Sequence, residues 1–118
     1  MGRLDAGGGW VTALLGAFAL IPRLWAVLRF SREPVWDGHY YHFGAQRIAE
    51  GLGYSEDALV GGVLRWRPWC HYPVGYSGLL GGLYRVLGDG LLVAPLFNVL
   101  VGVATVVCVH RLALHYLP

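Results

Sequence analysis

The amino-acid sequence predicts an all-α membrane protein, with three hydrophobic helices and one long polar, aromatic-rich loop between the first two. Of its 118 residues, 56% are hydrophobic and only 14% are charged, whereas soluble domains carry about 25% charged residues. A chain of this size also buries too little surface to hide so many apolar side chains from water. Lipid is therefore the expected solvent. The net charge of +2 is too small and too scattered to predict a nucleic-acid surface.

The first predicted transmembrane helix covers residues 10–30, and the third covers residues 91–114. Each is long enough, because about 20 residues cross a bilayer core of about 30 Å. Trp10 and Trp25 fit interfacial positions toward the two ends of the first helix. The second predicted helix, residues 74–87, is short for a span. It is expected either to begin above the lipid core or to lie where the bilayer thins.

The loop between the first two helices covers residues 31–73 and is expected to carry short amphipathic surface helices. Within it, His39–Leu52 has apolar residues near helical spacing, which is typical of a helix lying along the membrane surface. Gly51 and Gly53 are expected to end this helix. The Gly-Gly pair at residues 61–62 marks a turn.

Asp37 stands just before the predicted surface helix, between a tryptophan and a glycine. One interpretation is an N-cap, since an aspartate there accepts backbone N–H bonds and suits the positive end of the helix dipole. The other is a carboxylate at the membrane–water boundary that acts as a general base or binds a cation. The two roles are compatible, because a capped carboxylate is also a held one.

His39 and His42 are three residues apart, which can place two imidazoles on one helix face. With Asp37 and His71 they could form a metal site, and a divalent metal is the one cofactor that these residues suggest. Alternatively, interfacial histidines bond to neighbours or to lipid headgroups.

Arg65 and Arg67 belong to an aromatic stretch of the loop that also contains Trp66, Trp69 and Tyr72. Arginine beside aromatic rings suits the binding of a phosphate or a sugar by charge and stacking. The alternative is an aromatic belt that anchors the chain at the membrane interface.

The order of motifs along the chain resembles a known family. A hydrophobic helix with Arg near its end precedes Pro-x-Trp-Asp-Gly-x-Tyr-Tyr and Ala-x-x-Ile-Ala-x-Gly-x-Gly-Tyr; His-Tyr-Pro-x-Gly-Tyr, Leu-Tyr-Arg-Val-Leu-Gly-Asp and an apolar helix with Asn follow. This set resembles the N-terminal part of polyprenyl-phosphate-sugar-dependent membrane glycosyltransferases. These are GT-C class enzymes of the protein mannosyltransferase and aminoarabinose transferase type (glycosyltransferase family 39). The resemblance covers about residues 15–114.

The resemblance implies that residues 31–73 face the periplasm or its equivalent and that Asp37 is the catalytic base. Many relatives carry a second acidic residue directly after it, where this chain has Gly38; this departure weakens any role that needs the pair. Residues 85–89 match a short cytoplasmic turn. The candidate substrate-binding residues are Tyr40, Tyr41, Arg65, Arg67, His71, Tyr72 and Tyr76.

Charge and resemblance disagree about the side of the membrane on which the loop lies. The loop contains Arg32, Arg47, Arg65 and Arg67, and a count of positive charges alone places it in the cytoplasm. The resemblance places it outside. We follow the resemblance for two reasons. Carboxylates are interleaved with the arginines of the loop, and the arginines are also candidate phosphate-binding residues.

The function implied by the resemblance is inverting transfer of a sugar from a polyprenyl-phosphate donor to a hydroxyl of a glycan, lipid or protein, at the outer face of the inner (plasma) membrane. Members of this family run to several hundred residues, so the chain is expected to be a fragment or one part of a split assembly, inactive by itself. The alternatives are a small non-enzymatic three-helix membrane protein that acts as an assembly partner, and a transporter fragment with intramembrane charges at Arg23 and Arg85.

Overall fold

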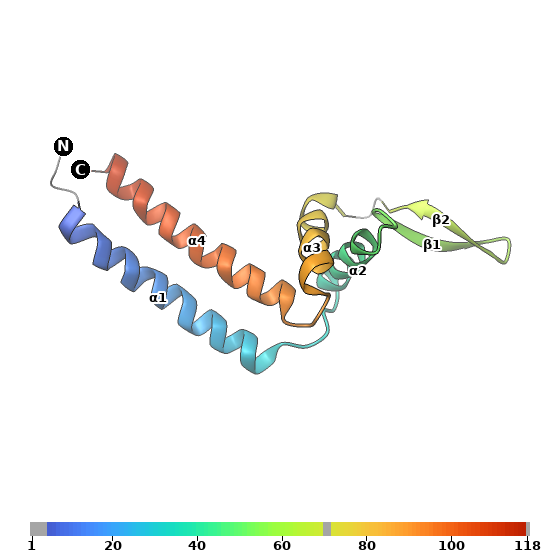
Figure 1. Ribbon diagram of the computed structural model, residues 1–118, viewed down its shortest axis with the longest axis horizontal. Coiled ribbons are helices and arrows are strands. Elements are labelled where there is room, and N and C mark those ends of the chain that lie inside the picture. The colour runs from blue at the N-terminus through green and yellow to red at the C-terminus, as the bar shows by residue number, and fades with distance from the viewer. Residues whose placement is uncertain (1–4, 70–71, 118) are drawn as a thin grey trace. The chain divides into compact units, whose positions relative to one another are not determined.

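The computed structural model describes residues 5–69 and 72–117, and the chain forms two compact units (Figure 1). The first, here called the helix pair, contains the residues up to Ser31 and those from Pro95 onward. The second, the central unit, is Arg32–Ala94. The helix pair is therefore discontinuous in sequence, whereas the central unit is one uninterrupted stretch.

Both helices of the helix pair are long and apolar enough to cross a membrane. α1 is Asp5–Phe30, with its candidate span beginning at Gly8, and α4 is Val93–Tyr116. Very few of their side chains are buried, as expected of surfaces that lipid rather than protein covers. The described chain thus contains two candidate membrane-spanning helices, at nearly the residues that hydropathy predicted.

α1 and α4 pack side by side in opposite directions. A Cβ atom on Gly8, near the start of α1, would lie 3.1 Å from the side chain of Leu114, near the end of α4. Toward the other end of the pair, a Cβ on Gly102 would lie 3.4 Å from the side chain of Arg23. These close approaches use glycines, which let helix backbones come near each other.

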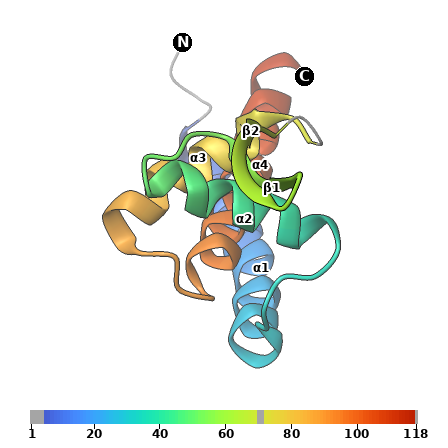
Figure 2. The same cartoon turned by 90° about the vertical axis from the view of Figure 1, so that its right-hand side faces the viewer.

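The central unit is built on two helices that lie side by side in both views (Figure 1, Figure 2). α2 is Asp37–Ala49 and α3 is Val74–Leu87. α3 has the predicted bounds, yet its 14 residues rise only about 21 Å, short of a bilayer core of about 30 Å. Among the described helices it is not a candidate span.

A glycine makes the contact between α2 and α3 possible. A Cβ on Gly81 would lie 2.7 Å from the Ile48 side chain and 3.1 Å from the Ala45 carbonyl oxygen. Ala45 is fully buried there, and so is Ser77, whose Oγ donates to the Tyr41 carbonyl at 3.1 Å. Small residues of α3 therefore pack against α2 of the same unit.

A two-stranded antiparallel hairpin follows α2, where the sequence predicted only turns and short helices. β1 is Ser55–Val60 and β2 is Val63–Pro68, with Val60 opposite Val63. Gly61 and Gly62 join them with φ of +62° and +81°, the left-handed backbone that tight two-residue hairpin turns require. The predicted Gly-Gly turn is confirmed, and the strands it connects are a new element.

Candidate functional site

Asp37 is the first residue of α2, and the residue before it has an unusual backbone. Trp36 occupies the N-cap position with φ 53° and makes no side-chain capping bond. It is the single non-glycine residue with positive φ in the described part of the chain, a conformation that costs energy and is concentrated at functional sites. The interpretation of Asp37 as the N-cap is therefore wrong, although its charge still suits the helix N-terminus.

The Asp37 carboxylate is held by a residue far away in the sequence. The Tyr72 hydroxyl donates to Asp37 Oδ1 at 2.6 Å. This hydrogen bond to a negative charge, together with smaller contributions from burial and from neighbouring groups, raises the pKa of Tyr72 to about 12. Tyr72 is consequently a neutral donor at physiological pH, and it fixes one oxygen of an exposed carboxylate.

Four tyrosines that the sequence selected as substrate-binding residues lie together beside Asp37, and we call them the tyrosine cluster. Tyr72 is in ring contact with Tyr40, at 5.4 Å between ring centroids, and with Tyr41, at 5.2 Å. Tyr41 meets Tyr76 edge to face at 5.3 Å. The cluster joins the first turns of α2 and α3, so the fold brings together residues from both ends of the loop.

Trp69 lies in the core of the central unit. Its ring contacts Phe43 at 5.2 Å, Tyr54 at 5.4 Å and Tyr40 at 5.7 Å between centroids, and its side chain is buried. A tryptophan in a membrane-interface belt would face outward. The belt interpretation therefore does not hold for Trp69, whereas the side chain of Trp66 lies outside what the structure describes.

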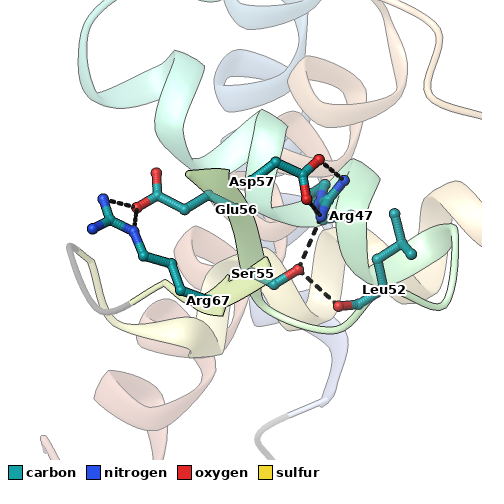
Figure 3. Close-up of polar contacts among 6 residues, drawn as sticks. All are labelled: Arg47, Leu52, Ser55, Glu56, Asp57 and Arg67. Atoms are coloured by element: carbon teal, nitrogen blue, oxygen red, sulfur yellow. Dashed lines mark hydrogen bonds and ion pairs between the residues drawn. The ribbon is translucent and has the colours of Figure 1, made fainter. Parts of the chain in front are cut away.

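The two candidate phosphate-binding arginines lie on β2 and differ in their partners. Arg67 Nε donates to Glu56 Oε1 at 2.6 Å, directly across the hairpin (Figure 3). Its charge is therefore already compensated. Arg65 faces Ala58, and no carboxylate in the described residues lies within ion-pair distance of it. Of the two, Arg65 is the cation still available to an external anion.

The histidines of α2 do not converge on a metal site. His42 Nδ1 lies 2.7 Å from the Tyr84 hydroxyl, at the contact with α3, and burial lowers the pKa of His42. His39 instead stacks on Phe43, with 6.4 Å between ring centroids. No group of three or more histidine, cysteine or acidic residues within the described ranges could hold a metal. His71, also a candidate metal ligand and substrate-binding residue, lies outside those ranges.

Sequence reasoning missed a second polar group, at the other end of the α2–α3 contact. Gln46 Nε2 donates to Asp89 Oδ2 at 2.6 Å, and this bond is the main cause of a lowered pKa at Asp89. Glu50 and Arg85 line the same hollow of about 300 Å³. The sequence indicates only a turn at Asp89. Its partner Gln46 lies 43 residues earlier in the chain, so no local spacing could predict this contact.

Comparisons with protein-family models, with curated proteins and with solved structures find no match to this chain.

Proposed function

We propose that the chain contributes to sugar transfer from a polyprenyl-phosphate donor at the extracytoplasmic face of the plasma membrane, with Asp37 as general base. The observation that carries the proposal is the exposed Asp37 carboxylate held by Tyr72 beside the tyrosine cluster. The sequence alone singled out these residues, and they come from the first turns of α2 and from the segment that leads into α3. A held carboxylate next to aromatic rings suits a sugar-handling site, because rings cover the apolar faces of sugars while the carboxylate accepts a hydroxyl proton.

In the proposed reaction, Asp37 takes the proton of the acceptor hydroxyl while the acceptor oxygen bonds to the anomeric carbon of the sugar. The bond from that carbon to the phosphate oxygen breaks, and its electron pair leaves with the phosphate. Tyr72 bonds to Oδ1, which leaves Oδ2 as the oxygen that receives the proton. Arg65 is the proposed contact for the negative phosphate, because its charge is uncompensated within the described chain.

The contacts of the helix pair support a topology with two spans. If the three predicted helices all crossed the membrane, the first and the third would cross it in the same direction, so α1 and α4 would be parallel. They pack antiparallel instead, and α3 is short. We therefore place α3 with α2 at the membrane surface, so that the whole central unit lies on one side and in one GT-C-like outer loop.

The function is tested by Asp37→Asn at the gene's own locus, with envelope glycolipids and glycoproteins compared by mass spectrometry. Removing a general base costs about 10²–10⁴ in rate, so one sugar modification should fall to trace levels. The matched control is Glu50→Gln, an exposed carboxylate at the end of the same helix. Tyr72→Phe should give a smaller loss, about tenfold, because it removes one hydrogen bond to a charged group.

Two outcomes would contradict the proposal. Unchanged envelope sugars in Asp37→Asn cells with normal protein levels would remove Asp37 from the chemistry. If deletion of the whole gene then still abolished a sugar, the chain would act as an assembly partner. That second candidate is favoured by the helix pair, whose exposed apolar faces suit packing against other membrane helices as well as lipid.

The proposed side of the membrane has its own test. Leu52 is exposed in the turn after α2, so a single cysteine placed there should react with a membrane-impermeant maleimide in intact cells. Reaction only after the cells are permeabilised would place the central unit in the cytoplasm, as the count of arginines predicts.

A further inference from the structure

The tip of the hairpin is apolar and exposed. Its four residues closest to the Gly-Gly turn are between 56% and 73% exposed: Leu59, Val60, Val63 and Leu64. Single exposed apolar side chains are common on proteins. Four exposed apolar side chains gathered at the end of one hairpin are unusual, and exposed apolar clusters commonly mark an interaction surface.

The register of the hairpin makes both faces of this tip apolar. Leu59 is opposite Leu64, and Val60 is opposite Val63. Neighbouring residues of a strand point to opposite faces, so one face carries the leucine pair and the other the valine pair. A hairpin that packs against a protein core needs only one apolar face. Two apolar faces fit a medium that surrounds the tip.

The charges of the hairpin leave one cation beside the tip. Glu56 is paired with Arg67, and Asp57 accepts from Arg47 of α2 at 3.2 Å and 3.3 Å (Figure 3). Both carboxylates of the hairpin are thus neutralised at its base. Arg65 follows Leu64 directly and has no ion-pair partner among the described residues. The tip therefore combines an apolar end with one uncompensated positive charge.

We propose that the hairpin tip inserts into the headgroup–acyl boundary of a phospholipid bilayer, with Arg65 at the level of anionic phosphates. Apolar side chains with basic residues behind them are the composition of interfacial membrane anchors. The occupant is lipid because both faces must be covered and because the central unit is joined in sequence to a candidate span at each end. The proposal does not rest on Asp37 or on sugar transfer.

The backbone groups at the edges of the hairpin limit how deeply its tip can insert. Within the described residues the two strands form one ladder, and no further strand pairs with the outer edge of either. Unpaired backbone N–H and C=O groups are costly in the hydrocarbon core but can bond to water and headgroups at the interface. The four tip side chains therefore reach the acyl boundary while the ion pairs at the base remain in water.

The test uses the full chain reconstituted in vesicles, with Cys70 and Cys108 replaced by serine and one new cysteine carrying an environment-sensitive fluorophore. The label is placed at Val63 in the tip or, as the matched control, at Leu52, an exposed apolar residue of the same unit outside the hairpin. We expect the Val63 label to shift to the blue, to be quenched by lipid-borne quenchers, and to be protected from aqueous iodide. The Leu52 label should show no blue shift, should escape the lipid-borne quenchers and should be quenched by aqueous iodide.

Two results would overturn the proposal. Equal iodide quenching at both positions would mean that the tip is in water. Protection from iodide without quenching from the lipid would mean that a protein surface covers the tip.

Two variants test the composition of the tip. Leu59→Asp with Leu64→Asp should shift the ratio of inserted to free tip by about tenfold or more, because burying one leucine is worth at least about 1.5 kcal/mol. Arg65→Gln should abolish any gain in insertion when phosphatidylglycerol is added to phosphatidylcholine vesicles. An unchanged gain would remove Arg65 from the docking surface. Since all three side chains are exposed, unaltered helix content by circular dichroism is the expected check on folding.

Discussion

The helix pair buries very few of its side chains, whereas the central unit buries small residues and links its elements with polar side chains. Between α1 and α4, Gly8 approaches Leu114, Gly102 approaches Arg23, and Thr12 Oγ1 lies 2.9 Å from His110 Nδ1. The central unit has a steric fit at Gly81, a tyrosine cluster and charge pairs at the base of the hairpin. The stability of the helix pair therefore depends mainly on the surrounding lipid, and that of the central unit on specific side-chain contacts.

This difference predicts how each unit responds to substitution. A helix surface covered by lipid can change one side chain for another of similar polarity at little cost, because lipid adapts to its shape. A close contact within protein cannot, because packed interiors have few voids. Single substitutions should therefore cost more in the central unit than in the helix pair.

The largest effect is expected from Gly81→Ala, which places a methyl group against Ile48 and the Ala45 carbonyl. Overpacking of this kind costs about 1–3 kcal/mol, and the better helix propensity of alanine returns at most about 1 kcal/mol. Protection of α2 and α3 amides from hydrogen exchange, measured in lipid nanodiscs, should fall. Gly82→Ala is the control, because nothing lies within 4 Å of its Cβ position; it should leave protection equal or higher. Equal losses in both variants would contradict a tight α2–α3 contact.

Asp57→Ala should have the next largest effect, on the attachment of the hairpin to α2. It leaves Arg47, whose side chain is only 12% exposed, without its carboxylate partner. A loss of about 1 kcal/mol is expected, seen as faster exchange of the β1–β2 amides. The control is Glu56→Gln, which removes the neighbouring pair with the mostly exposed Arg67 and should cost only a few tenths of a kcal/mol. A reversed order would mean that the cross-strand pair is the main restraint.

In the helix pair, Thr12→Val removes the contact with His110 and should cost only about 0.6 kcal/mol, the average for interhelical hydrogen bonds in membranes. Resonance energy transfer between labels on α1 and α4 in bilayers measures the association. Thr105→Val is the matched control, because the Thr105 hydroxyl donates to the Val101 carbonyl of its own helix. This variant should leave the association unchanged. A loss above that of Gly81→Ala would overturn the comparison between the two units.

The smallest effect is a pH dependence from His42, which burial keeps below its usual pKa of 6.5. The unfolded state then binds more protons than the folded state just below that pH, so stability is present above pH 6.5 and declines as the pH falls below it. Exchange protection of α2 and α3, corrected for intrinsic rates, should therefore be lower on the acid side. His42→Gln should remove most of this slope. A slope that survives in His42→Gln would belong to other groups.

Hydropathy was sufficient to predict the helix pair, because lipid exposure leaves a long apolar run in the sequence. Hydropathy also predicted the bounds of α3, residues 74–87. It could not predict that α1 and α4 are antiparallel, which is the observation that argues against α3 as a span. The hairpin was missed because its tip is apolar on both faces and so lacks the alternation that marks a half-buried strand. Asp37 and the four tyrosines were selected as candidate site residues, and the structure places them together. The Asp37–Tyr72 bond joins residues 35 apart in the sequence, so no local spacing could predict it.

The division of the chain also orders its assembly during synthesis. α1 emerges first and has no packing partner until α4 is made, because the whole of Arg32–Ala94 lies between them. The central unit is continuous, so all of its contacts can form as soon as Ala94 has left the ribosome. Once folded, it shortens the flexible stretch that separates the two ends of the helix pair and lowers the entropy cost of joining them. Folding of the central unit thus favours the later pairing of α4 with α1.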